Sequence, residues 1–462
     1  MLRLDKMETV PEDLIVKLIN EHEKEKYFIM QEYYEGRNIE ILNKKSKGSN
    51  DPNNQIINNF AGFITDVSVG YFMGKPVTYT TSVNNETMLE ELTDIFKYND
   101  EADENLELAK IQSIKGTAFE ILYTDEREDG MVIPRFDVID PDNIIIAYDK
   151  SISKEPSLAI YYYEDVDLEK DETSTVIYLY TDKSVFNYVL KDDALTLIDV
   201  MDHHFDLVPI VEFPNNDERQ GDFEKVMTLI DAYDNLQSND MDDSEYHADA
   251  YLKIINMSAT DADDIQKMKS DRVIKLDEDG DADWLIKNID HTGKETLKNR
   301  IQEDIHKLSM TPNLTDERFA HNLSGVALEF KLWGLEQSSS QKERKFKKGL
   351  QRRIELIFNF LKNKARTYEW RDVGITFTRN IPQNLKEIAE VAVKLKGTVS
   401  DSTVLSMLPM VDDVAMEQEK IEQEERKAQD NIMKTLYKDI EKDKSAYEPE
   451  LKTFDLDSAK LY

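Results

Sequence analysis

Apolar residues in the first half of the chain recur at helical spacing near its beginning and at strand-like spacing further on. Phe60, Ile64 and Tyr71 lie on one face of a predicted helix that ends near Gly74, before a short strand. Residues 86–114 also show a helical pattern. Six later segments are rich in β-branched and aromatic residues and predict strands. These are residues 132–138, 144–148, 157–164, 175–181, 185–190 and 210–213.

A long amphipathic helix is predicted over residues 223–247. Val226, Ile230 and Tyr233 recur at helical spacing on one face, and the opposite face is acidic. A small insert follows, in which short runs predict one helix and three strands. These are the strand 252–255, the helix 261–269 and the strands 273–276 and 284–286.

A second helix is predicted after this insert. Residues 292–295 form a capping box that opens it, and Ile301 and Ile305 lie on its apolar face. Pro312 ends the helix, because proline cannot continue the helical hydrogen bonds. A polar loop over residues 311–324 then leads to the longest predicted helix.

That longest helix spans residues 325–366 and is about 60 Å long at ~1.5 Å per residue. We expect a kink at residues 337–341, which follow a glycine and lack apolar anchors. One strand and three helices are predicted beyond it. They are the strand 374–378 and the helices 382–397, 402–408 and 413–434. We expect the charged residues 435–462 to be flexible.

The chain is strongly acidic, with 94 Asp and Glu against 58 Lys and Arg and a formal net charge of −36 over 462 residues. Such a chain is not expected to hold DNA over a wide surface, because that affinity comes from cations that displace condensed counterions. The absence of cysteine excludes disulfides, thiolate metal sites and cysteine nucleophiles. The N-terminus is too charged for a secretory signal, and no apolar stretch approaches the length of a membrane span. We expect a soluble protein from a reducing compartment.

Three local patterns resemble chemical sites, and each has a simpler structural interpretation. Residues 70–76 are one residue short of a phosphate loop, and Pro76 replaces its magnesium-binding hydroxyl, which favours a helix-ending turn. Residues 277–283 alternate carboxylates as a calcium loop does, but their glycine is fourth rather than sixth, which favours a turn between strands. The seven histidines lack ligand spacing. We expect neither a cofactor nor a bound metal.

The acidic face of the helix 223–247 is the remaining chemical candidate. It carries Asp231, Asp234, Asp240, Asp242 and Asp243. A two-metal nuclease or phosphohydrolase needs carboxylates that converge from several elements, whereas one helix face supplies a single row. We therefore favour a charged face exposed to water, and we predict that the chain is not an enzyme.

Several strings of residues, taken in order, resemble the portal proteins of tailed bacteriophages, specifically those of siphophages that infect Gram-positive bacteria. The matching segments extend over residues 33 to about 366. They are residues 33–42, INNFAGFITD at 57–66, GYFMGKP at 70–76, NDERQGDF at 216–223, DAY at 231–233, DIHKLS at 304–309 and NLSGVA at 322–327. Beyond residue 397 the similarity is limited to helical and acidic character.

The resemblance implies an α+β portal fold and a ring, usually of twelve subunits, at one vertex of the capsid. Double-stranded DNA is pumped in along the ring axis and later leaves by the same route. The implied parts, in chain order, are a mixed α/β wing (1–222), a first stem helix (223–249), a small α/β clip (250–290), a second stem helix (291–310), a tunnel loop (311–324), a second wing part with the long kinked helix and a strand (325–380), a helical crown (381–434) and a flexible acidic tail (435–462).

The resemblance also implies partners. They are the large subunit of the terminase motor, a head-completion or adaptor protein, the major capsid protein and a scaffolding protein, with no membrane. It implies a place in the virion and, during assembly, in the host cytoplasm. Docking of the motor and the connector is assigned to clip residues, namely Ile265, Lys269, Asp279, Gly280 and Asp281.

A channel wall that attracted DNA would slow its passage, so we expect the bore to be acidic or neutral. Twelve copies at −36 each carry roughly −430 charges, enough to keep a duplex centred. Lys294 and Lys298 are one turn apart and would add a shallow basic ring, but we favour their pairing with acidic residues of the helix 223–247. The tunnel-loop residues assigned to the channel are Thr311, Asn313, Thr315, Asp316, Glu317, Arg318 and Asn322.

Two other classes of function remain open at this point. A metal-dependent nuclease or phosphohydrolase predicts magnesium-dependent cleavage that is lost when Asp240 and Asp242 are mutated. An acidic scaffold or adaptor without DNA contact predicts a monomer or a small oligomer with no central hole. A DNA-conducting ring predicts no magnesium-dependent cleavage and a large oligomer with a central hole.

Overall fold

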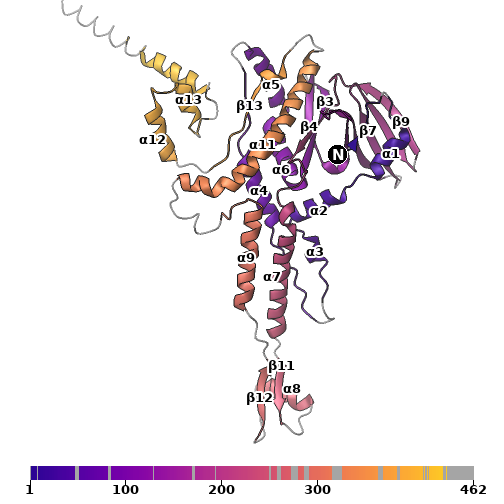
Figure 1. Cartoon of the computed structure of the whole chain (residues 1–462), viewed down its shortest axis with the longest axis vertical. Helices are drawn as coiled ribbons and strands as arrows, with labels where there is room; N and C mark the ends of the chain where they lie inside the picture. Colours follow the sequence, from indigo (N-terminus) through magenta and orange to yellow (C-terminus); the bar gives the residue numbers. More distant parts are fainter. Residues whose placement is uncertain are drawn as a thin grey trace, which may run out of the picture. The chain divides into compact units, whose positions relative to one another are not determined.

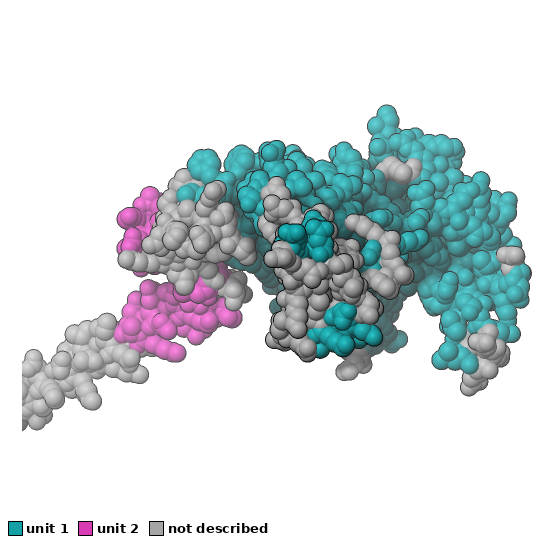
Figure 2. Space-filling view, turned by 90° about the horizontal axis from the view of Figure 1, so that it is seen from below, with its two compact units in different colours: residues 1–380 teal, residues 381–462 magenta. Residues whose placement is uncertain are grey.

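The structure is a computed structural model, and its described residues form two compact units, one within residues 1–380 and one within residues 381–462 (Figure 2). Within the described part of the chain, none of the helices combines the length and the apolar content that crossing a bilayer requires. The described residues are 2–7, 9–46, 51–81, 85–127, 130–168, 172–192, 194–248, 251–256, 262–271, 279–285, 291–314, 325–362, 368–381, 385–408, 410–411, 414, 416–429 and 433.

The beginning of the first unit is helical, as the apolar spacing predicts. Its helices are α1 (Glu12–Asn20), α2 (Glu25–Tyr34), α3 (Ile39–Leu42), α4 (Phe60–Met73), α5 (Glu86–Tyr98) and α6 (Glu101–Lys115). The predicted helix over 86–114 is two helices, because Asp100 has a φ of 50° and interrupts the helical hydrogen bonds. α4 buries Ile64 and Phe72 and ends at Gly74, as predicted.

Three strands form a small antiparallel sheet in the order β10–β3–β4. They are β3 (Thr117–Glu126), β4 (Val132–Ile139) and β10 (Ile210–Pro214). β4 and β10 confirm predicted strands, whereas the central strand β3 was not predicted. Glu120 lies fully buried in the middle of β3, and it breaks the apolar run by which a central strand is recognised.

A second sheet has six strands in the order β1–β5–β6–β7–β8–β9, and only the β1–β5 pair is parallel. The strands are β1 (Leu2–Arg3), β5 (Ile144–Tyr148, after the short helix η1, Pro141–Asn143), β6 (Pro156–Asp167), β7 (Glu172–Tyr180), β8 (Ser184–Lys191) and β9 (Ala194–Asp202). β5 to β8 confirm predictions. β9 was not predicted, and most of this edge strand is exposed. Helix α1 packs Ile15 and Leu18 on the sheet, against Ile160 and Ile177.

The helix α11 (Gly325–Lys362) spans 38 residues and passes through the largest apolar cluster of the unit. Its buried Phe346, Leu350 and Ile354 pack with residues of α4, α5 and β3. In Figure 1 its ribbon changes direction towards the N-terminal end; the predicted position of the kink stays a prediction. Beside it, β2 (Thr78–Thr80) pairs with β13 (Gly374–Thr376), after the short helix η3 (Trp370–Asp372).

Two long helices and a small insert lie between the β10 strand and α11 in the sequence. They are η2 (Glu224–Val226), α7 (Met227–Ala248), β11 (Tyr251–Ile255), α8 (Ala262–Asp271), β12 (Asp281–Leu285) and α9 (His291–Leu308). β11 and β12 pair with each other, and the predicted strand 273–276 lies outside the described residues. α9 confirms the predicted second helix and begins at His291, one residue before the predicted start at Thr292. The Thr292 carbonyl accepts a hydrogen bond from the Thr296 hydroxyl.

The second unit is helical over its described residues. α12 (Leu385–Leu395), α13 (Asp401–Ser406) and a helical stretch at residues 416–429 confirm the three predicted helices. Gly397 follows α12 with a φ of 85°, a conformation that glycine adopts without strain. Residues 435–462, expected to be flexible, lie outside the described residues.

Candidate functional site

The helices α7 and α9 lie side by side and run in opposite directions (Figure 1). Where α7 begins and α9 ends, the contact is apolar: Ile305 of α9 is fully buried in one cluster with Val226 of η2 and Ile230 of α7. The ring of Phe60 from α4 meets the Tyr233 ring at a centroid distance of 5.1 Å and an angle of 87°. This end of the helix pair is therefore continuous with the folded body of the first unit.

At the other end, ion pairs join the two helices. Lys294 Nζ lies 2.8 Å from Asp240 Oδ1 and 2.7 Å from Asp243 Oδ2, and Lys298 Nζ lies 3.1 Å from Asp240 Oδ2. The hydrogen bond from Lys294, followed by that from Lys298, lowers the pKa of Asp240 against the smaller opposing effect of burial. The favoured sequence interpretation, in which both lysines pair with the acidic helix, is confirmed within the subunit.

The opposite side of α7 is covered by a polar segment from the N-terminal part of the chain, whose described residues 38–46 and 51–58 we call the strap. Asp234, at 0 % exposure, accepts hydrogen bonds from Asn38 Nδ2 at 3.0 Å and from the Asn58 backbone N–H at 2.9 Å. The Ser238 hydroxyl accepts from the Ile56 N–H at 3.0 Å. Strap and helix are thus joined by directional contacts to the backbone as well as to side chains.

Two further aspartates continue this row along α7. Asp242 accepts from Lys44 Nζ at 2.6 Å and from the Asn54 backbone N–H at 2.6 Å. Asp231 accepts from the Tyr33 hydroxyl at 2.7 Å. Burial raises the pKa of Asp242, but the bonds from Lys44 and Asn54 outweigh it and the net shift is downward. For Asp234, burial dominates and the pKa is raised.

The prediction that this acidic face is exposed to water is therefore wrong. Asp231, Asp234 and Asp242 lie on the strap side, and Asp240 and Asp243 lie on the α9 side. Side chains two positions apart in a helix, such as Asp240 and Asp242, point in directions that differ by about 200° around the helix axis. The donors on the strap are 176 to 198 residues away in sequence, so no local pattern reveals them. α7 is consequently the middle layer of three.

The start of α7 is fixed to the body of the unit by a buried ion pair. Asp222 Oδ2 lies 2.6 Å from Lys342 Nζ of α11, and both side chains are almost fully buried. Burial raises the pKa of Asp222, but the Lys342 charge and hydrogen bonds from Lys342, Ser113 and Asn215 outweigh it and lower the pKa. A Cβ on Gly221 would lie 2.3 Å from the Ile114 carbonyl oxygen, so only glycine fits this approach.

The described part of the predicted tunnel loop ends at Leu314. Thr311 is fully buried, and its backbone N–H donates to the His306 carbonyl at 3.2 Å, while its carbonyl accepts from His306 Nδ1 at 3.1 Å. Thr311 is thus bonded to its own segment here, and its assignment to the channel stays a prediction. Asn313 is half-buried. The other assigned residues lie outside the described residues: Thr315, Asp316, Glu317, Arg318 and Asn322.

The residues assigned to docking lie in the insert between α7 and α9. Ile265 and Lys269 are in α8, and Asp279 lies in a turn that precedes β12. Asp281 is the first residue of β12 and is paired with Ile255 of β11. The turn and the strand agree with the preference for a strand-joining turn over a calcium loop, although residues 277 and 278 lie outside the described residues.

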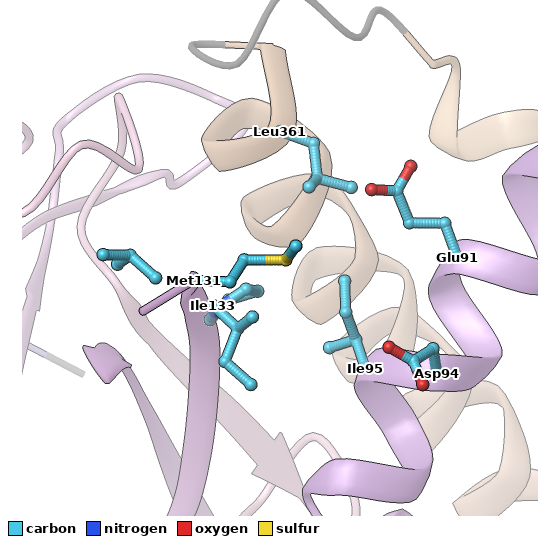
Figure 3. Close-up of a pocket in the computed structure, with 8 residues that line it drawn as sticks. Glu91, Asp94, Ile95, Met131, Ile133 and Leu361 are labelled. Carbon is cyan, nitrogen blue, oxygen red and sulfur yellow. The ribbon is translucent and has the colours of Figure 1, made fainter. Parts of the chain in front are cut away.

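The described residues also contain a small pocket of about 170 Å³ between α5, β4 and α11 (Figure 3). Its two carboxylates are engaged: Glu91 accepts from the Tyr368 hydroxyl at 2.9 Å, and Asp94 lies 3.1 Å from Arg127 Nη1. Pockets that hold small molecules are typically ~300 Å³ or larger. Across the described ranges, no three His, Asp or Glu side chains gather in a way that could hold a metal ion.

Comparison with known proteins agrees with this architecture. Residues 14–431 match the family described as "Phage portal protein, SPP1 Gp6-like". The chain is 26% identical over 421 residues to a portal protein of Clostridium phage phiCD119, covering 86% of this chain and 92% of the relative. It is 27% identical over 450 residues to the portal protein of Bacillus phage SPP1, covering 89% of this chain and 86% of the relative. Because the family match covers most of the chain, this protein belongs to the SPP1 Gp6-like family of phage portal proteins.

Proposed function

We propose that the chain assembles into a ring of about twelve copies at a capsid vertex, through which double-stranded DNA is packaged and later ejected. The observation that carries this proposal is the pair α7–α9, which is fixed at one end to a folded body and has the insert β11–α8–β12 between its helices. The family membership supports the same role. The protein would act as a conduit and not as an enzyme, because the aspartates of α7 are already bound by amide, hydroxyl and ammonium groups.

Within this proposal, α7 and α9 form the stem, the insert over 250–290 forms the clip, and residues 381–434 form the crown. The clip residues Ile265, Lys269, Asp279, Gly280 and Asp281 would dock the terminase large subunit and later the head-completion protein. The first 222 residues and α11 would form the wing, which meets the major capsid protein and the scaffolding protein. Residues 311–324 would form the tunnel loop around the duplex.

We further propose that α9, and not α7, presents its free side to the DNA. α7 lies between the strap and α9, whereas α9 keeps one exposed stripe on the side away from Ile305. This stripe consists of Thr296, Arg300, Glu303 and Lys307. With two cations and one carboxylate it is close to neutral, which suits a wall along which a duplex slides. Lys294 and Lys298 would then support the wall from behind.

Electron microscopy of the purified protein tests the main proposal. We expect top views with a central hole and rotational symmetry, and a single compact particle without a hole would contradict it. Magnesium-dependent cleavage of DNA by the pure protein, lost in Asp240→Asn with Asp242→Asn, would support the nuclease alternative instead. For the α9 wall, we expect Arg300→Glu with Lys307→Glu to assemble normally and to change the length of packaged DNA.

A further inference from the structure

A large groove of the first unit lies between α11, β10 and the loops over residues 149–155 and 214–219. It encloses about 1370 Å³. Its floor is apolar, with Val208, Ile210 and Val211 all nearly fully buried. Gly349 allows α11 to lie directly on β10, because a Cβ there would lie 2.3 Å from the Phe213 ring. The groove is thus built by a close helix–strand contact and not by a loose loop.

The charge of this groove differs in sign from that of the chain. Among its described lining residues, eight cationic side chains face six carboxylates, whereas the chain carries −36. Several of these charges neutralise one another. Examples are Arg352 with Glu355 at 2.8 Å, Arg219 with Glu212, and Lys345 with Asp217.

Three cations of the groove are exposed and make no ion pair with any described residue. They come from separate parts of the chain: Arg3 from β1, Lys154 from a loop and Lys348 from α11. One carboxylate, Glu218, is equally unpaired among the described residues. The unpaired charge is therefore positive, and it borders an apolar floor.

We propose that this groove receives an acidic surface of a second copy of the chain and is one half of the contact between neighbouring subunits. The inference rests on the proposed ring. A cyclic ring joins two different patches of the same chain, which must complement each other. Because each copy carries a net charge of −36, most of its surface repels another copy. A locally cationic groove would instead attract the acidic surface of a neighbouring subunit.

A DNA duplex fits this groove less well. The floor is apolar, and carboxylates such as Glu155, Glu212 and Glu218 line the same space and would repel phosphates. An interface between proteins, by contrast, combines an apolar centre with a charged rim. DNA as the occupant is therefore the outcome that would overturn the proposal.

Because the chain has no cysteine, one introduced thiol reports directly on this groove. We would prepare Lys348→Cys and, as matched control, Lys97→Cys, which replaces an exposed lysine of α5 outside the groove. In assembled rings we expect the thiol at 348 to react with a maleimide on the order of tenfold more slowly than in dissociated subunits, because a neighbouring subunit seated on the groove would cover this position. The thiol at 97 should react equally fast in both states.

Equal reactivity at position 348 in rings and subunits would overturn the proposal, and so would protection that appears only after DNA is added. Wild-type protein that forms no ring would instead contradict the proposed function, so the two failures are distinguishable.

A charge-reversal experiment tests the same interface. Arg3→Glu, Lys154→Glu and Lys348→Glu together should reduce ring assembly. The control triple Lys97→Glu, Lys362→Glu and Lys394→Glu changes net charge equally and should assemble normally. Circular dichroism of both triples establishes that each is folded.

Discussion

The body of the first unit and the α7–α9 pair are held together by different forces. Around α11, buried Phe, Leu and Ile side chains fill one continuous cluster, and the fully buried Arg353 lies against the Phe136 ring of this cluster. Among the described residues, α7 has comparable apolar packing near its beginning, at Ile230, and further along it is bound through aspartates that accept hydrogen bonds. The first region depends on burial, and the second depends on charge and hydrogen-bond direction.

This difference suits the two proposed roles. A wing must keep its shape, and apolar packing is insensitive to salt and to small displacements of charge. A stem around a moving polyelectrolyte experiences changing electrostatic fields, so its own carboxylates are best neutralised internally. Asp242 is paired with Lys44 and Asp240 with Lys294, on opposite sides of α7. In the proposed ring, the outer face of α9 would then set the character of the channel.

The largest effect is expected in the apolar body. Arg353→Met would leave Glu120, which is 0 % exposed, without the guanidinium that donates to its Oε2 at 2.9 Å. Loss of one partner from a buried pair typically costs about 3–5 kcal/mol. We expect a loss of this size in the free energy of unfolding, measured with urea. The double variant Arg353→Met with Glu120→Gln should recover part of it, because the side chain at position 120 is then uncharged and Glu101 alone keeps a carboxylate beside the former guanidinium. No recovery would show that packing, and not charge, is responsible.

A smaller and more local effect is expected on the strap. Asp234→Ala leaves the Asn58 backbone N–H without its acceptor and removes one of the two acceptors of the Asn38 amide, whose bond to Asp231 remains. Unsatisfied buried donors cost about 1–3 kcal/mol. We expect faster hydrogen exchange in residues 51–60 and in α7, with exchange in α11 unchanged. Thr228→Ala, on an exposed position of the same helix, is the control and should change neither.

The contrast between the two regions also explains what the sequence could predict. α4 and α7 could be predicted from apolar spacing, because an apolar helix face can be buried against any apolar surface and does not need one specific partner residue. β3 was missed because Glu120 interrupts its apolar run, and Glu120 is tolerated only through Arg353, 233 residues away. β9 was missed because its residues are exposed on both sides and therefore carry no burial pattern.

The acidic face of α7 shows the same limit within the candidate site. Its helical row of aspartates was visible, but its partners on the strap were not, because asparagine and backbone donors give no periodic signal. The pairing of Lys294 and Lys298 with α7 was predictable, since opposite charges one turn apart on adjacent antiparallel helices attract. Polar contacts between a helix and an irregular segment therefore cannot be predicted from a single sequence, because they leave no periodic pattern.

A third prediction concerns the far end of α7. Lys294→Met with Lys298→Met removes the ion pairs to Asp240 and Asp243. Partly exposed pairs contribute about 0.2–1 kcal/mol each, so we expect about 1 kcal/mol, expressed as faster hydrogen exchange in residues 240–248. The effect should shrink as salt is raised. Arg300→Met, on the exposed side of α9, should leave that exchange unchanged; an equal effect would contradict the assignment.

The smallest predicted effect is a dependence on pH, and it has opposite sign in the two regions. Burial, followed by the charge of Asp137, raises the pKa of Glu104 in α6 to about 7, whereas the pKa of Asp240 is lowered by its lysines. Asp240 therefore contributes stability above its ordinary pKa of 3.8, and that contribution is lost as pH falls through the lower pKa of the folded state. Glu104 behaves in the reverse way.

For Glu104 the unfolded chain loses its proton near pH 4.5 and the folded chain near pH 7, so deprotonation progressively favours unfolding between these values. Glu104→Gln cannot ionise, and its carbonyl can still accept from the Val138 N–H, now at 3.1 Å from the carboxylate. We expect the variant to gain less than about 1 kcal/mol over wild type at pH 7.5, since the half-exposed carboxyl is screened by water, and nothing below pH 4.5. Glu107→Gln, an exposed neighbour on α6, should show no such trend. A gain that is the same at both pH values would mean that Glu104 acts through packing and that the two regions do not differ in the sign of their proton linkage.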